Sequence, residues 1–245
     1  MTRVHGIDVS NNNGSLNWTR IAASGVKFCY AKASESTTYV DSWYARYRAG
    51  AKDHGIAFGA YHFAHPSGNG TTQARFFLAK AKVAPGDLIP VLDVERTDGR
   101  NKVAVRKFVT DFANEVHRQL GVWPLLYSTA SFINNYVGPR VGGMELWVAH
   151  WAVAVPAVPA GWPAWRVWQD GGTGLDHDVA NLPLPIYRKE APVPTPTPTP
   201  AVKYPTSYLV IRRSCMGLNA FYKRLSPSWQ AEVDERVLRW VKFGR

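Results

Sequence analysis

The chain has 245 residues, enough for one large domain or for one domain with a small appendage. Hydrophobic residues make up 46% of it, which argues against wholesale disorder, and no run reaches the roughly 18 apolar residues of a membrane span. The net charge of +11 favours binding to polyanions, but no motif that reads nucleic acid accompanies it, so we expect no specific nucleic-acid partner.

Strand-like apolar runs alternate with amphipathic stretches along the first 190 residues. The expected strands are Val4–Val9, Val26–Ala33, Ala57–Phe63, Leu88–Val94, Val122–Ser128, Leu146–Ala152 and Arg166–Gln169. The expected helices are Trp18–Ala23, Asp41–His54, Thr71–Lys82, Lys102–Leu120 and 129–137. This alternation predicts parallel strands joined by crossover helices, and the continuous apolar run at 88–92 indicates strands buried on both faces, as in a barrel. Helices become scarce in the last third, so we expect the barrel to close irregularly.

A proline at every second position in 192–200 predicts a semi-rigid linker, residues 191–202, between a domain at 1–190 and a small segment at 203–245. The segment carries nine Lys or Arg residues against three acidic ones, and 226–240 is typical of a capped helix. Two interpretations remain open: the segment binds anionic polymers of a cell wall, or it is merely a solvated tail.

Acidic residues follow several of the expected strands. In a parallel barrel the catalytic groups sit at the carboxyl ends of the strands. The acidic residues there are Asp8, Glu35, Asp93, Glu95, Asp176 and Asp178. Glycosidases need such a cluster, because one carboxyl group protonates the leaving oxygen while others stabilise the positive charge that develops on the sugar.

Asp93 and Glu95 are two residues apart, which on a strand places both side chains on one face with Cα atoms about 6.5 Å apart. Close carboxylates oppose each other's ionisation, so one pKa should rise. We expect the longer Glu95 to be the general acid and Asp93 to stay ionised. Such a triplet in isolation more often caps a helix or pairs with Arg96 and Arg100, so the assignment depends on its context.

Aromatic residues near the strand ends are candidates for a sugar-binding groove, because a flat ring can lie against a sugar face. They are Tyr61, Phe63, Tyr127, Trp147, Trp151 and Trp168. Packing in a barrel core is the alternative, and it weighs equally for Trp147 and Trp151. No metal-binding array, serine-hydrolase elbow or phosphate loop is present, so we expect neither a metal nor a cofactor.

Five short motifs occur in order along the first 180 residues of the chain. They are His5–Ser10 (HGIDVS), Lys32–Asp41 (KASESTTYVD), Gly59–Ala64 (GAYHFA), Pro90–Glu95 (PVLDVE), and Trp168-Gln169 followed by Asp176. From His5 to about Pro185 the sequence resembles the family 25 glycoside hydrolases, the lysozymes of fungi, bacteria and phage lysins. The resemblance implies an α/β fold, an irregular (β/α)5β3-type barrel, and hydrolysis of the β-1,4 bond between N-acetylmuramic acid and N-acetylglucosamine in peptidoglycan.

The resemblance also assigns roles to the acids. Glu95 is implied to be the acid/base, Asp93 its partner, and Asp8 and Asp176 further catalytic carboxylates, while Glu35 joins the substrate-binding candidates. The family's last motif, Val-Asp-x-Asn-x-Phe, is represented by residues 175–180, so Asp178 replaces the Asn. Both late acids remain candidates, with Asp176 favoured for catalysis and Asp178 for substrate binding. The resemblance favours a substrate-assisted mechanism, and double displacement stays open.

The start of the chain shows no charged segment followed by an apolar one, so we expect no secretory signal. The two cysteines, Cys29 and Cys215, are too few for a disulfide framework. We expect a monomeric phage endolysin, made in the host cytoplasm and acting on the extracytoplasmic wall. The alternative is a non-catalytic wall-binding protein that uses the same barrel.

Overall fold

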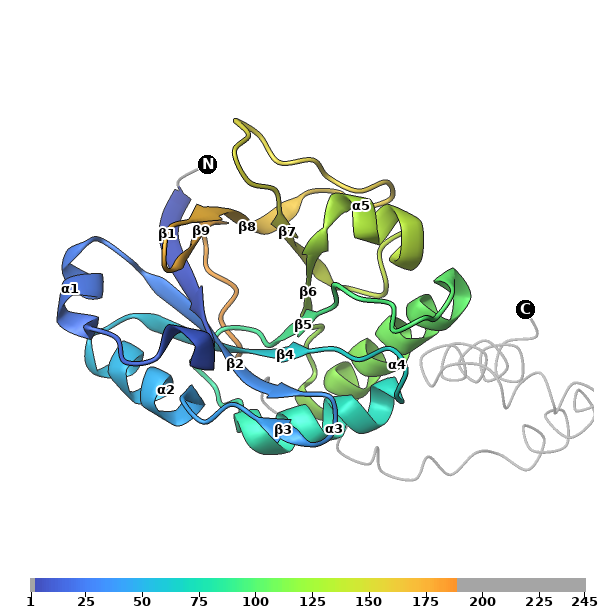
Figure 1. Ribbon diagram of the computed structural model, residues 1–245, viewed down its shortest axis with the longest axis horizontal. Coiled ribbons are helices and arrows are strands. Elements are labelled where there is room, and N and C mark those ends of the chain that lie inside the picture. The colour runs from blue at the N-terminus through green and yellow to red at the C-terminus, as the bar shows by residue number, and fades with distance from the viewer. Residues whose placement is uncertain (1–2, 189–245) are drawn as a thin grey trace, which may run out of the picture. The chain divides into compact units, whose positions relative to one another are not determined.

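A computed structural model describes residues 3–188, and the predicted linker and C-terminal segment lie outside the described residues (Figure 1). In the described part, one sheet has the strand order β1-β9-β8-β7-β6-β5-β4-β2-β3, and β1 also pairs with β2. This last pairing closes every strand except β3 into a barrel. The strands are β1 (Arg3–Val9), β2 (Phe28–Glu35), β3 (Tyr39–Val40), β4 (Ala57–Phe63), β5 (Val91–Asp93), β6 (Leu125–Thr129), β7 (Glu145–Ala149), β8 (Trp165–Gly172) and β9 (Asp176–Asn181).

The barrel is parallel from β1 through β2, β4, β5, β6 and β7 to β8, and β9 runs antiparallel to both of its neighbours, β1 and β8. The expected α/β barrel with an irregular closure is therefore confirmed. Strand β9 was not predicted, because it begins Asp-His-Asp and its acidic side chains face the barrel interior. Strand β5 starts at Val91 instead of Leu88, since Pro90 has no N–H to offer the sheet.

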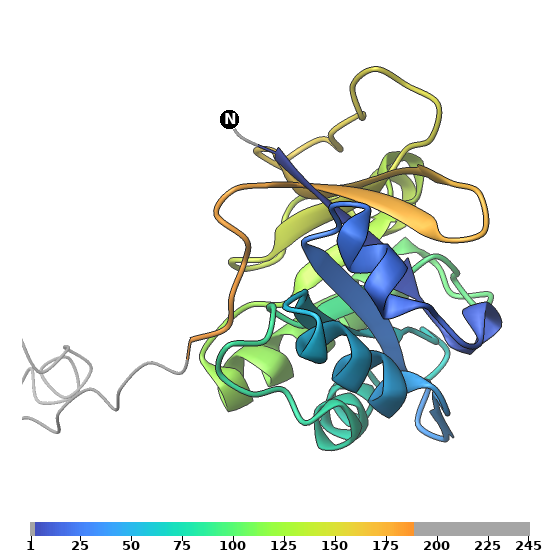
Figure 2. The same ribbon diagram turned by 90° about the vertical axis from the view of Figure 1, so that its left-hand side faces the viewer.

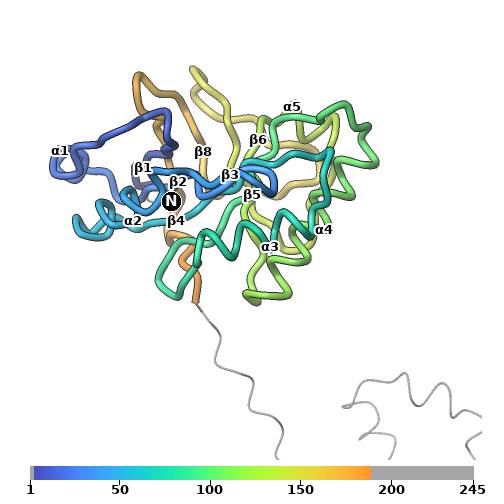
Figure 3. The backbone as a smooth tube through the Cα atoms, turned by 60° about the horizontal axis from the view of Figure 1, so that its bottom comes forward, coloured from blue at the N-terminus to red at the C-terminus, as the bar shows by residue number. Residues whose placement is uncertain are grey.

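The helices are α1 (Trp18–Ala23), α2 (Tyr44–Asp53), α3 (Gly70–Ala81), α4 (Lys102–Leu120) and α5 (Ala130–Phe132), with a 3-10 turn η1 (Asn11–Asn13) and a π-helical turn η2 (Ile133–Val137). Helices α3 and α4 pack together on one side of the barrel, and β8 and β9 lie on the opposite side (Figures 1 and 3). Figure 2 shows β8 and β9 as a hairpin beside β1, with no helix between them. Helices thus cover the part of the barrel that is built from the earlier strands, whereas the connections from β7 to β8 and from β8 to β9 contain no helix.

Helix α4 begins and ends where its sequence predicts. The Asn101 side chain accepts a hydrogen bond from the Ala104 N–H, and Gly121 ends the helix with a φ of 76°, a left-handed conformation that suits glycine. Residues 94–100 connect β5 to this helix, so the cap fixes the end of that segment next to the helix.

Alternation along the strands separates two hydrophobic cores. Inside the barrel lie Phe28, Tyr30, Leu88, Val91, Leu125, Trp147, Val167 and Ala180. The larger outer core fills the space between the barrel and its helices, and it contains Leu92, which lies between Val91 and Asp93. The apolar interior ends before the carboxyl ends of the strands, and polar side chains occupy the last interior positions there.

Candidate active site

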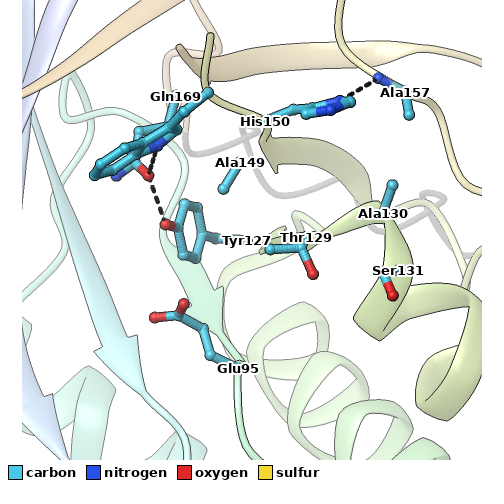
Figure 4. Close-up of a pocket in the computed structure, with 10 residues that line it drawn as sticks. Glu95, Tyr127, Thr129, Ala130, Ser131, Ala149, His150, Ala157 and Gln169 are labelled. Carbon is cyan, nitrogen blue, oxygen red and sulfur yellow. Dashed lines mark hydrogen bonds between the residues drawn. The ribbon is translucent and has the colours of Figure 1, made fainter. Parts of the chain in front are cut away.

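The carboxyl ends of the strands enclose a cavity of about 210 Å³. Its lining comes from eight strands and the segments next to them: Asp8, Ser10, Asn12, Lys32, Tyr61, Phe63, Asp93, Glu95, Tyr127, Trp147, Gln169 and Asp176. A wider pocket of about 560 Å³ adjoins it and shares Glu95, Tyr127 and Gln169 with it (Figure 4). The two together form a groove, and Glu95 lies where they meet.

The sheet register brings acids from distant parts of the chain together. Asp93 is the last residue of β5 and pairs with Phe63 on β4 and Tyr127 on β6. Asp8 on β1 pairs directly with Asp176 on β9. Of the predicted catalytic residues, all four line the same cavity: Asp8, Asp93, Glu95 and Asp176.

Asp93 is the more deeply buried member of the central pair. Its side chain is 5% exposed, and its Oδ1 has no hydrogen-bond partner among the described residues. Burial raises the pKa of Asp93 well above its ordinary value, and the nearby charges of Glu95 and Asp8 add to this effect. We expected the pKa of Glu95 alone to be raised, but the pKa values of both groups are raised, and burial acts more strongly on Asp93.

Glu95 follows β5 and is accessible from the groove. Partial loss of hydration in the groove raises the pKa of Glu95 above the ordinary value for a glutamate, although a hydrogen-bonding contribution from Asp93 opposes the shift. The Asp93–Glu95 pair therefore retains a proton at pH values where an isolated carboxyl group has lost its own.

Lys32 is the one Lys or Arg residue that lines the cavity, and the sequence analysis did not select it. Its Nζ pairs with Glu35 and lies 4.8 Å from the ring centroid of Phe63. The Glu35 side chain is turned away from the cavity lining, towards Lys32 and His65, so it holds Lys32 in place. Burial opposes the ionisation of Glu35, but the hydrogen bonds from Lys32 and His65 outweigh it and lower the pKa of Glu35.

Gln169 is a second residue that the sequence analysis missed, although it belongs to the quoted Trp168-Gln169 motif. Its Nε2 donates to Asp8 Oδ2 at 2.7 Å. Its Oε1 accepts from the Tyr127 hydroxyl at 2.8 Å and from Trp151 Nε1 at 2.9 Å, and Figure 4 shows the bond to Tyr127. One side chain thus orients a carboxylate and two aromatic groups of the groove.

The predicted aromatic residues divide into groove and core positions. Tyr61, Phe63, Tyr127 and Trp147 line the smaller cavity, and Trp151, which is 51% exposed, lines the larger pocket. Trp151 does not share a strand face with Trp147, because β7 ends at Ala149. The groove position predicted for Trp168 is wrong: this side chain is 6% exposed, packs in the outer core, and donates to the His150 carbonyl. Its neighbours Val167 and Gln169 take the interior positions.

The two late acids lie at different depths. Asp176 lines the cavity, and burial raises its pKa. Asp178 is 0% exposed and accepts a hydrogen bond from Trp147 Nε1 at 3.0 Å. Asp178 therefore lies below the groove surface and cannot contact a sugar there, contrary to the expectation that it binds substrate.

Within residues 3–188, no group of three or more His, Cys, Asp or Glu side chains is placed to hold a metal ion. Over the same residues, no helix is both long and apolar enough to cross a membrane.

A closed β/α barrel with carboxyl groups from three strands in an aromatic-lined groove defines the class of the glycoside hydrolases. Within that class, residues 7–178 match the profile of the glycosyl hydrolases family 25, and the chain belongs to this family. The chain is 36% identical over 188 residues to Lysozyme M1 of Streptomyces globisporus, covering 70% of this chain and 63% of that relative. It thus spans less than two thirds of that relative's length.

Solved structures show the same architecture. The bacterial lysozyme from Streptomyces coelicolor is similar with a TM-score of 0.70 and 33% identity, covering 74% of this chain and 93% of that one. The family GH25 lysozyme from Aspergillus fumigatus is similar with a TM-score of 0.70 and 31% identity, covering 74% and 95%.

Proposed function

We propose that this chain is a lysozyme that hydrolyses the β-1,4 bond between N-acetylmuramic acid and N-acetylglucosamine in bacterial peptidoglycan. The observation that carries the proposal is the position of Glu95, where the two parts of the groove meet, beside the buried Asp93. Family membership and the lysozymes among the similar proteins support the same substrate.

The groove residues account for the chemical steps. Glu95 donates its proton to the bridging oxygen as the bond between that oxygen and the sugar C1 breaks, and its raised pKa keeps the proton available. The carboxyl groups of Asp93, Asp8 and Asp176 surround the position where positive charge develops. Water then supplies the new hydroxyl group at C1, and its proton returns to Glu95.

The test compares the wild type with Glu95→Gln on purified peptidoglycan. Removing the proton donor should lower the rate of turbidity loss about 10²–10⁴-fold, while binding to the sedimented wall persists. The matched control is Asp111→Asn, which removes an acid on α4 that pairs at the surface with Lys107 and should leave the rate unchanged.

Product analysis decides which bond is cut. Mass spectrometry of the digest should find muramic acid at the new reducing ends. Reducing-end glucosamine would mean that the other glycosidic bond is cleaved. Wall binding by the wild type with no cleavage at all would favour the non-catalytic alternative.

We further propose that the protein is a phage endolysin, a bacteriolytic enzyme that reaches the extracytoplasmic wall of the host and lyses the cell. The order of a barrel domain, a Pro-rich stretch and a basic segment supports this, since a second wall-binding site would hold the enzyme on its polymeric substrate. Production in a bacterial cytoplasm should lyse the cells only when the inner membrane is also opened. Intact cells after opening, despite activity on purified peptidoglycan, would contradict the proposal.

A further inference from the structure

Asp8 and Asp178 form a second carboxyl pair beneath the groove, apart from Asp93 and Glu95. In the β1–β9 ladder, Asp8 is paired with Asp176 and Gly6 with Asp178, so Asp8 and Asp178 are diagonal neighbours on the interior face. Diagonal neighbours on one face of an antiparallel ladder lie within side-chain reach. The two carboxyl groups therefore lie close enough for each to shift the pKa of the other.

The remaining contacts of the pair are unequal. Asp8 faces the cavity, and its Oδ2 accepts a hydrogen bond from Gln169 Nε2 at 2.7 Å. Asp178 is wholly buried, its Oδ1 accepts from Trp147 Nε1, and its Oδ2 has no hydrogen-bond partner in the described chain. Neither carboxyl group has a salt-bridge partner within residues 3–188.

Two neighbouring carboxylate anions would repel each other, and a charged Asp178 would be wholly buried with no donor for its Oδ2 among the described residues. One of the two must carry a proton, and the contacts indicate which. The charge is better placed on Asp8, which has an N–H donor and access to the groove, and the proton on Asp178, which has no access to solvent.

We propose that Asp8 and Asp178 share one proton, held by Asp178, and that Asp178 is a positioning residue whose O–H orients Asp8 and limits hydrolysis at high pH. The pH limit rests on the proposed lysozyme function, whereas the shared proton does not. When the proton leaves, two adjacent anions repel each other and Asp8 turns away from its position beside the sugar.

The titratable groups around the pair reinforce the retention of the proton. Those nearest to it on the packed strands are acids, phenols and a thiol: Asp176, Asp93, Glu95, Tyr30, Tyr61, Tyr127 and Cys29. Lys32, across the cavity that Asp8 lines, carries the opposing positive charge. Burial raises the pKa of Asp8 to about 7, with Gln169 and Asp178 opposing the shift and the charges of Asp176 and Glu95 adding to it. Burial also raises the pKa of Asp178 well above its ordinary value, and the charges of Asp8 and Asp176 add to that shift. The two groups titrate as a unit, so these directions describe the pair.

Asp178→Asn removes the ionisable proton but keeps the size and shape of the side chain. The amide can accept from Trp147 Nε1 with its oxygen and donate to Asp8 with its nitrogen, but it has no proton to lose. In pH–rate profiles of the full chain on peptidoglycan, we expect the alkaline limb of Asp178→Asn to lie at higher pH. One pH unit above the wild-type alkaline midpoint, the wild type should retain about a tenth of its maximal rate, and the variant should retain about tenfold more of its own.

The free energy of unfolding tests the shared proton without any activity. An unfolded Asp loses its proton near pH 4, whereas folded Asp178 keeps it, so the folded state binds more protons and wild-type stability falls as pH rises from about 4 to 7 and above. Asp178→Asn lacks this contribution, so its stability relative to the wild type should increase over the same range. Asp111→Asn, the control at a half-buried position on α4, should show no such increase.

The pH titration of side-chain carboxyl ¹³C signals in the wild type provides a measurement that does not depend on how a variant folds. Asp178 should keep its protonated signal well above about pH 4, where an ordinary aspartate ionises. Ionisation of Asp178 near pH 4, or a flat stability difference between Asp178→Asn and the wild type, would overturn the shared proton. If Asp178 keeps its proton but the alkaline limb of the Asp178→Asn profile coincides with that of the wild type, the proposed pH limit alone is wrong. If the wild type does not cleave peptidoglycan, the proposed lysozyme function alone is wrong.

Discussion

At the scale of single residues, the groove depends on side chains that make several contacts at once. Gln169 is the clearest case, because its amide nitrogen bonds to Asp8 while its oxygen bonds to Tyr127 and Trp151. An amide can do this, since it carries a donor and an acceptor in one planar group. A carboxylate of the same shape would keep the acceptor and lose the donor.

Replacing Gln169 with Glu should therefore lower kcat about 10–100-fold, because a hydrogen bond to a charged group is worth roughly 1.5–3 kcal/mol and the new carboxylate repels Asp8. Steady-state kinetics on peptidoglycan measure the effect, with circular dichroism to show that the fold is kept. Gln119→Glu, at an exposed position near the end of α4, is the matched control and should retain full activity. Equal kcat values for Gln169→Glu and the control would show that Gln169 does not orient Asp8.

At the scale of elements, the segment from β5 to α4 carries Glu95 and has no regular structure of its own. Asp98 ties it to the segment after β4: its Oδ2 accepts from the N–H and the hydroxyl of Ser67 and lies 3.4 Å from His65 Nδ1. Arg100 joins the same two segments by donating to the Ser67 carbonyl at 3.2 Å. These bonds hold the segment three residues after the proton donor.

Removing the tie with Asp98→Ala should lower kcat about tenfold or more while KM changes little, because a small displacement of a catalytic group is costly even when the substrate still binds. Asp98→Asn keeps one acceptor oxygen and tolerates the residue's positive φ of 49°, so it should recover part of the rate. Asp53→Ala, at the exposed end of α2, is the control. A change in KM alone would contradict a positioning role.

At the scale of the whole molecule, the site rests on a barrel whose interior is filled with side chains. Tyr30 and Trp147 pack against each other in it with ring centroids 4.9 Å apart and ring planes tilted by 35°, and Val167 packs in the same inner core. Because this apolar filling lies directly beneath the acids, it also supplies the dry surroundings that raise their pKa values.

Trimming the interior should cost stability in proportion to the cavity left behind. Val167→Ala removes two methyl groups from a fully buried position and should lower the free energy of unfolding by about 2 kcal/mol. Val103→Ala makes the same chemical change at a side chain that is 78% exposed, and its effect should stay within about 0.5 kcal/mol. Urea unfolding of both variants checks this, and equal losses would contradict a tightly packed interior.

Much of this protein follows from its sequence alone, because strand and helix patterns are local. Helices α1 and α4 begin and end where the pattern predicts, and the acids at Asp8, Asp93, Glu95 and Asp176 stand out because they follow or end strands. The ordered motifs point to the family. Alternation also predicts which neighbours share a face, as with Val167 and Gln169.

Alternation cannot say which face is inside, and only the closed barrel decides that. It turns Trp168 outward into the helix layer and Gln169 inward to Asp8. It also determines depth, since burial depends on strands that are distant in the sequence. Asp93 lies deeper than Glu95, and Asp178 lies beneath Asp176 beside Asp8, so the protons are retained where the surroundings are driest.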